Sequence, residues 1–218
     1  MSVWLAIECS NARGGLALLR EDGTPLEEIA WEEAPLRQTR LFTALDELLA
    51  RRNLAPTEIA GFAVGRGPGN YSGLRAALTL ARGLALPRGR PVRAVSSGSA
   101  LADEWFAAPN TARPLAVMGD ARRGRIWSGV FHPGETAAGP RDGWQLTTPA
   151  DLPRTLPTDG CDLVSPEPER LTRLPGWPAA WTPLIRRGDP TACAVGRRAL
   201  NPAARPEPLT PIYLHPAV

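Results

Sequence analysis

Residues 65–75 read GRGPGNYSGLR, and this glycine-rich stretch decides how the first half of the chain folds. It follows an apolar run at 59–64 that predicts a buried strand, and it leads into an apolar helical pattern at 74–86. A glycine-rich connection from a buried strand to a helix is typical of a sheet that is covered by helices. The stretch therefore predicts an α/β fold.

Regular elements continue on both sides of this loop. Short apolar runs bounded by turn residues predict strands, and leucines at helical spacing predict helices. We expect strands at 3–7, 15–19, 26–31, 59–64 and 92–95, and helices at 37–52, 74–86 and 96–106. This order, βββαβαβα, places an antiparallel meander and two parallel strands in one mixed sheet with helices over it.

The second half of the chain is rich in loops, since 17 of the 24 prolines follow residue 110. The elements expected there are strands at 114–118 and 125–131, the turn 119–124 between them, a helix at 191–200 and an extended segment at 211–214. The restarted strand pattern predicts two lobes. Residues 1–108 form the first, and residues 109–218 form a smaller, proline-rich copy of it whose last segment packs back on the first.

The composition excludes several chemistries. All 25 basic residues are arginines, so a lysine-containing phosphate loop, a kinase lysine and a Schiff-base amine are absent. His132 and His215 are the two histidines of the sequence, which excludes a three-histidine metal site. We therefore expect no catalytic residue, no metal site and no cofactor held by this chain alone.

The cysteines and the N-terminal residues predict a cytoplasmic protein. Cys9, Cys161 and Cys193 form no Cys-x-x-Cys pair, which fits buried thiols in a reducing compartment. The first residues carry no basic segment and reach the carboxylate of Glu8, unlike a signal peptide. No apolar run approaches the roughly 18 residues that a membrane span needs.

The loop 65–75 and the turn 119–124 are the first candidate site. Backbone N–H groups and the helix dipole converge at such a loop, where a nucleotide phosphate or another anion would sit. The same glycines also suit a tight turn without a ligand, or a loop at an interface. We expect Ser72 to cap the helix. The candidate residues are Arg66, Gly67, Gly69, Asn70, Tyr71, Ser72, Gly73, Arg75, Asp120 and Arg122.

Two acidic residues near strand ends leave alternatives open. Asp120, beside the arginines of the turn, either positions a nucleotide or partner or belongs to a solvated turn. Glu8 ends the first strand, and the sequence supplies no second carboxylate near it. We therefore expect a strand-end charge at Glu8 rather than a metal site.

The helix at 74–86 is apolar on two sides. One side carries Leu74, Ala77, Leu78, Ala81 and Ala85, and the other carries Ala76, Leu80, Gly83 and Leu84. A helix of this kind must be covered on both sides. One cover is its own sheet, and the other is either a neighbouring helix of the chain or a second protein.

Five segments together resemble the bacterial TsaB (YeaZ) family of tRNA threonylcarbamoyladenosine biosynthesis proteins. They are LAIECS at 5–10, GLAL at 15–18, the loop 65–75, DARRG at 120–124 and PIYL at 211–214. The resemblance covers nearly the whole chain. It is strongest over 59–102 and weak over 133–190.

The resemblance implies a two-lobed actin/Hsp70-like (ASKHA, ribonuclease H-like) fold and a non-catalytic scaffold or activator subunit. Such a subunit binds and activates the TsaD-type transferase, which makes N6-threonylcarbamoyladenosine at position 37 of tRNA. A TsaE-type ATPase joins the assembly, ATP or ADP sits at the partner interface, tRNA is reached through the complex, and the subunit alone is a homodimer. The implied partner interface is Leu41, Leu45, Leu48, Ala76, Ala77, Leu80, Gly83 and Leu84.

Departures from the family pattern and two competing functions stay open. The first strand ends in Glu8-Cys9-Ser10 instead of Asp-Thr-Ser, and Arg37 replaces a histidine ahead of the first helix. The first competing function is a stand-alone ATP-dependent phosphotransferase or glycoprotease-like hydrolase. The second is direct tRNA binding through the arginines near 122–125 and 186–198.

Overall fold

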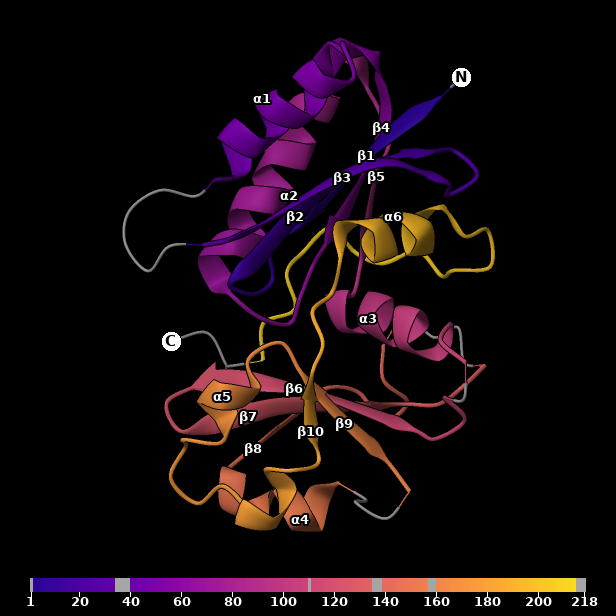
Figure 1. Cartoon of the computed structure of the whole chain (residues 1–218). Coiled ribbons are helices and arrows are strands. Elements are labelled where there is room, and N and C mark those ends of the chain that lie inside the picture. Colours follow the sequence, from indigo (N-terminus) through magenta and orange to yellow (C-terminus); the bar gives the residue numbers. More distant parts are fainter. Residues whose placement is uncertain (1, 34–39, 110, 135–138, 157–159, 215–218) are drawn as a thin grey trace.

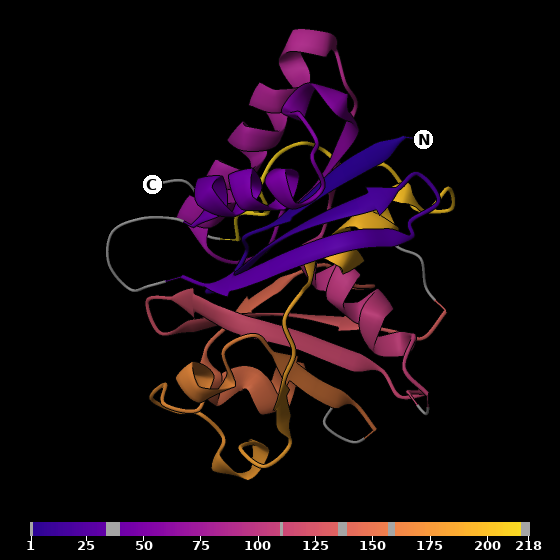
Figure 2. The same cartoon turned by 45° about the horizontal axis from the view of Figure 1, so that its top comes forward.

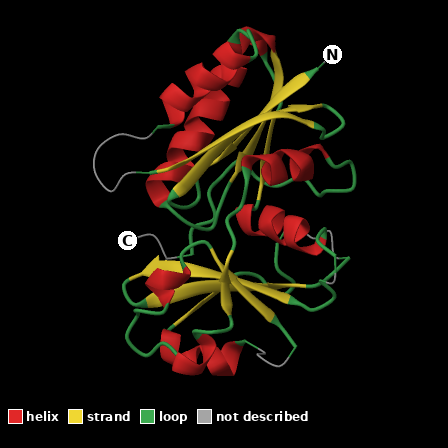
Figure 3. Cartoon of the chain, in the orientation of Figure 1, coloured by secondary structure: helices red, strands yellow, loops and turns green. Residues whose placement is uncertain are grey.

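The computed structural model describes residues 2–33, 40–109, 111–134, 139–156 and 160–214. In these ranges the chain forms two lobes, one above the other in Figure 1, each built on a five-stranded sheet. Figure 3 shows strands at the centre of each lobe and helices on their faces. The two-lobed α/β architecture expected from the sequence is confirmed.

The first lobe follows the expected order. It contains β1 (Val3–Glu8), β2 (Arg13–Arg20), β3 (Pro25–Glu32), α1 (Leu41–Arg51), β4 (Ile59–Gly65), α2 (Tyr71–Ala85), β5 (Val92–Val95) and α3 (Ser97–Phe106), with short 3-10 helices at Pro56–Glu58 and Leu86–Arg88. The expected start of the first helix, Arg37, lies outside the described residues. The mixed βββαβαβα order is confirmed.

The second lobe has shorter elements. It contains β6 (Leu115–Arg122), β7 (Arg125–Phe131), β8 (Gln145–Thr147), α4 (Leu152–Thr155), β9 (Asp162–Ser165), α5 (Pro168–Leu171) and β10 (Ile185–Arg187), followed by α6 (Ala192–Leu200). Within the described residues, no helix is both long enough and apolar enough to cross a membrane. The three cysteines are buried thiols, as expected.

One expected turn is shorter than the sequence indicated. Strand β6 continues to Arg122, so Asp120 and Arg122 lie in the strand rather than in a turn at 119–124. The connection to β7 is reduced to Arg123 and Gly124, whose φ angles are 53° and 69°. Positive φ at both residues matches the twist of a two-residue hairpin, which is why the pairing extends so close to the turn.

The two sheets share one topology. The strand order is β3-β2-β1-β4-β5 in the first sheet and, read from the matching edge, β8-β7-β6-β9-β10 in the second. In both, the first three strands pair antiparallel and the last two join them parallel. The second lobe therefore repeats the topology of the first with shorter elements, as the sequence predicted.

Helices cover the faces of both sheets. The last helix of each lobe packs on the sheet of the other lobe: α6 on the first sheet and α3 on the second. Helices α1 and α2 cover one face of the first sheet, and α6 covers the other (Figures 1 and 2). Helix α3 packs on the second sheet, where Leu101 joins Trp127 and Phe131 in one cluster. The lobes expected at 1–108 and 109–218 therefore meet through α3 and α6.

Side chains alternate between the two faces of β1, and this alternation explains how α1 and α2 on one face and α6 on the other pack against the first sheet. Leu5 and Ile7 face α1 and α2, whereas Ala6 faces α6. Small residues on the α6 side let this helix lie close to the strands. A Cβ added at Gly196 of α6 would lie 2.4 Å from the Leu19 Cδ1 and 3.1 Å from the Ala6 Cβ.

We expect Gly196→Ala to lower the free energy of unfolding, by about 2 kcal/mol, because Leu19 is fully buried and cannot move aside. The control is Gly83→Ala, the same change in a helix at a position with no atom within 4 Å. There the better helix propensity of alanine adds up to about 1 kcal/mol. Urea unfolding of both variants measures the difference, and equal stabilities would contradict this packing.

Candidate functional site

The glycine-rich loop 66–70 lies directly on the connection between β1 and β2. A Cβ on Gly69 would lie 1.9 Å from the carbonyl oxygen of Ser10, and a Cβ on Gly73 would lie 2.2 Å from that of Cys9. The backbone N–H of Asn70 donates to the Ser10 carbonyl at 2.6 Å. These glycines are therefore required for backbone packing within the chain.

Most donors of the loop already have acceptors in the chain. The N–H of Arg66 donates to the Val95 carbonyl at 2.9 Å, and that of Gly67 donates to the Ser97 Oγ at 3.1 Å. An anion at this loop would have to compete for these N–H groups. The geometry favours the interpretation of the loop as a packed turn.

Asn70, not Ser72, caps α2. Its side-chain oxygen accepts from the N–H groups of Ser72 at 3.1 Å and Gly73 at 3.5 Å. The helix therefore begins at Tyr71, three residues before the expected start at 74. The prediction of Ser72 as the cap was wrong because Asn70 is the last residue with an extended backbone, as a capping residue requires.

Glu8 is buried beneath this loop. Its carboxylate accepts from the Ser97 Oγ at 2.7 Å and from the Ser10 N–H at 2.5 Å. Burial raises the pKa of the Glu8 carboxyl, while the bonds from the serines oppose that shift. Glu8 ends β1, as expected, and its buried carboxyl ties β1, the loop and the start of α3 together.

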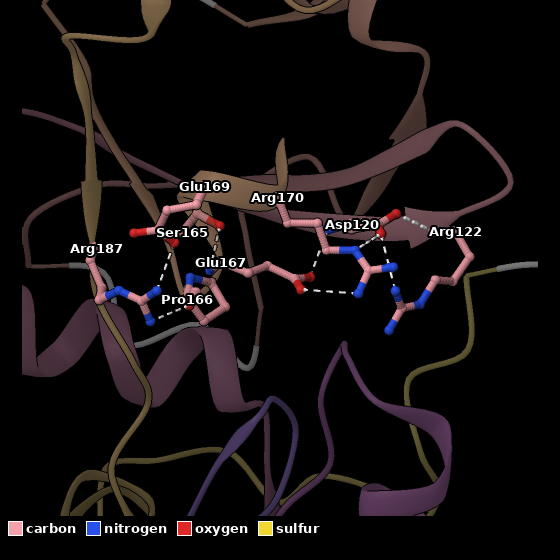
Figure 4. A network of polar contacts seen from close by, with 8 residues as sticks. All are labelled: Asp120, Arg122, Ser165, Pro166, Glu167, Glu169, Arg170 and Arg187. Carbon is pink, nitrogen blue, oxygen red and sulfur yellow. Dashed lines mark hydrogen bonds and ion pairs between the residues drawn. The ribbon is translucent and has the colours of Figure 1, made fainter. Parts of the chain in front are cut away.

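The second lobe brings Asp120 and Arg122 together in a polar network (Figure 4). Asp120 Oδ1 accepts from the Arg122 N–H at 2.6 Å, and Oδ2 pairs with the guanidinium groups of Arg122, at 3.3 Å, and Arg170. The Asp120 N–H donates to Glu167 Oε1 at 3.1 Å. Asp120 is thus held within the chain rather than in a solvated turn.

Sequence reasoning missed Glu167 and Arg170. Both belong to the segment PEPER at 166–170, whose alternating prolines and charges resemble an ordinary loop. The Glu167 N–H donates to the Ser165 Oγ at 3.0 Å, which orients the segment toward β6. Burial raises the pKa of the Glu167 carboxyl to about 6. The hydrogen bond from the Asp120 N–H opposes this rise, the negative charge of Asp120 adds to it, and the charge of Arg187 opposes it.

The expected partner interface divides into two sets. Leu41, Leu45, Leu48 and Ala77 are buried in the core of the first lobe. These residues pack on the first sheet, because the stripe of α1 and the inner face of α2 both point toward it. The structure corrects their placement from the surface to the interior.

The remaining four residues line an open groove of about 430 Å³. The groove is formed by Phe42, Arg75, Ala76, Thr79, Leu80, Gly83 and Leu84. Phe42 from α1 is 54% exposed, and the sequence analysis missed it because it lies beside the buried leucine stripe. Two apolar helix faces thus meet at the surface around an uncovered hollow.

Arg66, Tyr71 and Arg75 lie on the exposed side of the glycine-rich loop. The Arg66 guanidinium pairs with Glu207 at 3.2 Å. Tyr71 stacks on Tyr213 with ring centroids 5.1 Å apart, and the Arg75 guanidinium lies over the Tyr71 ring. Arg66 and Tyr71 thus contact the C-terminal part of the chain, and Arg75 contacts Tyr71. In the part of the chain that the structure describes, no group of acidic, histidine or cysteine side chains fits a metal ion.

The sequence is similar to known proteins of tRNA modification. Residues 36–140 match the family model described as TsaD, tRNA N6-adenosine threonylcarbamoyltransferase. The chain is 36% identical over 127 residues to the tRNA threonylcarbamoyladenosine biosynthesis protein TsaB of Bacillus subtilis, covering 58% of this chain and 54% of that protein. It is 31% identical over 143 residues to TsaB of Escherichia coli, covering 62% and 60%. The matched region therefore spans little more than half the length of these relatives.

The fold is similar to that of a solved bacterial structure. YeaZ from Pseudomonas aeruginosa superimposes with a TM-score of 0.73 and 25% sequence identity. The superposition covers 98% of this chain and 100% of that one. The similarity therefore includes both lobes, whereas the sequence matches concentrate in part of the chain.

We expect Glu167→Gln to flatten the pH dependence of stability. The folded pKa near 6 lies above the ordinary value of 4.5, so this group stabilises the fold fully below pH 4.5, and the contribution is lost as the pH rises through 6. We expect the loss to be about 1 kcal/mol after solvent screening.

Urea unfolding at pH 4.5 and pH 6.5 measures this effect. The matched control is Glu169→Gln, an exposed carboxyl in the same segment whose pKa is lowered. Parallel pH profiles for the wild type and Glu167→Gln would contradict the assignment.

Proposed function

Because the chain is similar in sequence to TsaB proteins and in fold to YeaZ, we propose that it belongs to the TsaB/YeaZ family and is a non-catalytic scaffold or activator subunit in the synthesis of threonylcarbamoyladenosine in tRNA. It acts in the cytoplasm. Its partner is a TsaD-type transferase, which it binds and activates, and a TsaE-type ATPase joins the assembly. The tRNA is reached through the complex.

The groove along α2 carries this proposal. Its lining is mostly apolar, and half of the large Phe42 side chain is exposed. Exposed apolar hollows between helices are typical of surfaces that a second protein covers. Without a transferase subunit, a second copy of the chain occupies the same face, which makes the homodimer and the complex alternatives.

The first-lobe loop supports a subunit without turnover of its own. Most of the loop donors that would hold a phosphate are engaged within the chain, and Glu8 is fully buried and accepts hydrogen bonds from serines. A carboxylate in this state is a poor ligand for an incoming metal-nucleotide complex. ATP or ADP would accordingly be held with the partner rather than by this chain alone.

Ion pairs within the chain favour indirect contact with tRNA. Arg122 pairs with Asp120, Arg187 pairs with Glu169, and Arg198 pairs with Asp103. An arginine that is already paired releases fewer counterions from a nucleic acid than a solvated one. These three arginines, out of those at 122–125 and 186–198, are therefore weak candidates for direct binding.

We expect Phe42→Glu to weaken binding to the TsaD-type transferase at least about tenfold, because docking would move a carboxylate out of water into a mostly apolar groove and would remove the apolar contact of Phe42. Phe42 is exposed enough for the fold to tolerate the change. Leu80→Glu, at the centre of the groove, should act in the same direction. Calorimetry and size-exclusion chromatography with the purified transferase measure both variants.

The matched control is Leu184→Glu, which places the same charge at an exposed apolar residue of the second lobe. It should bind the transferase like the wild type. Wild-type affinity of the two groove variants, with circular dichroism unchanged, would move the docking surface elsewhere.

We expect the purified chain to hydrolyse ATP no faster than a buffer blank containing Mg²⁺. The matched variant is Asp120→Asn, which changes the acidic residue that the enzyme alternative would use. A hydrolysis rate that survives repeated purification and is lost in Asp120→Asn would establish the phosphotransferase or hydrolase alternative and overturn the scaffold proposal.

A further inference from the structure

The segment 205–214 returns from α6 to run over the first lobe and down toward the second. In Figure 1 it is the yellow coil that descends between the lobes to the edge of the second sheet, where the described part of the chain ends. It carries no helix and no strand longer than a single bridge to Ala94. Its position nevertheless rests on many specific contacts.

The upper end of this segment is held by Glu207. The side chain is 1% exposed and accepts from the Ser96 N–H at 2.9 Å. The Arg66 guanidinium lies 3.2 Å from it, and the Arg198 guanidinium lies 3.9 Å away. Ser96 caps α3, so one carboxylate links the segment to the glycine-rich loop, α6 and the start of α3.

The middle of the segment follows the glycine-rich loop and α2. Arg66 donates its Nε–H to the Thr210 carbonyl at 2.8 Å, and its own carbonyl accepts from the Ile212 N–H at 2.8 Å. The Arg82 guanidinium donates to the Leu209 carbonyl, and the Leu209 side chain packs on the core of the first lobe. Leu209, Thr210 and Ile212 are thus each fixed to the first lobe.

The lower end reaches the second lobe. Tyr213 stacks on Tyr71 of α2 with ring centroids 5.1 Å apart. The next residue, Leu214, packs on the apolar cluster that includes Trp127 and Phe131 of β7. Two adjacent side chains therefore contact different lobes.

We propose that residues 207–214 form a clamp that holds the two lobes in one relative orientation, with Glu207 as its latch. The clamp joins the lobes on the side of the glycine-rich loop, while α3 and α6 join them through their own contact. A pair of lobes that is joined at two separated places cannot rotate about either one alone. Releasing the clamp leaves the α3–α6 contact as the hinge.

The test distinguishes a segment that holds the two lobes together from a segment that only stabilises the first lobe. The double variant Tyr213→Ala/Leu214→Ser keeps Glu207 and Leu209 in place but removes both contacts at the lower end. The matched control is Leu184→Ser, which removes an exposed leucine from the second lobe. Both proteins are measured by small-angle X-ray scattering and by hydrogen exchange with mass spectrometry.

The clamp predicts a larger radius of gyration for the double variant and about tenfold faster exchange in the peptides that face the other lobe, α3 and β7 among them. The first-lobe core strands should exchange as in the wild type. The control should match the wild type in both measurements. Faster exchange confined to 211–214, with an unchanged scattering profile, would overturn the clamp.

The variant Glu207→Gln supplies a second, independent test of the clamp. The amide oxygen still accepts from the Ser96 N–H, whereas the charge that attracts Arg66 and Arg198 is lost. We expect faster exchange along 207–214 and a partial increase in the radius of gyration. A folded variant with faster exchange along 207–214 but an unchanged radius of gyration would also overturn the proposal. Neither measurement depends on transferase binding.

Discussion

A carboxylate inside the protein sets the geometry of the first lobe. Removing the Glu8 side chain from water is unfavourable, and the Ser97 hydroxyl and the Ser10 N–H compensate for it. The Ser97 oxygen also accepts from Gly67, so the same contact holds the glycine-rich loop. This arrangement joins β1, the glycine-rich loop and the start of α3, which lie far apart in the sequence.

The direction of α2 decides which of its faces is left uncovered. Periodicity alone predicts its inner face correctly, since Leu74, Ala77, Leu78, Ala81 and Ala85 are the buried residues of the helix. The predicted order of strands and helices along the first lobe, βββαβαβα, is likewise confirmed, because alternation and helical spacing are local signals. Local patterns therefore carry most of the fold.

The candidate site was harder to predict because its contacts are distant in sequence. The resemblance to a family implied that Leu41 and Leu45 lie at a partner interface, and their spacing could not correct this, because a leucine stripe looks the same whether a sheet or a partner covers it. Glu167 lies 47 positions from Asp120, and Glu207 lies 141 positions from Arg66, so no spacing indicates either contact. Buried polar pairs of this kind depend on the tertiary fold.

The exchange of helices between the lobes also constrains how the chain is made. The first sheet is finished when β5 emerges from the ribosome, but α6, which covers one of its faces, follows about a hundred residues later. During synthesis at the usual speed of about 5–20 residues per second, that face waits for several seconds. This face is rich in alanine, with Ala6, Ala17 and Ala63, so it exposes little apolar area to an unwanted partner during this interval.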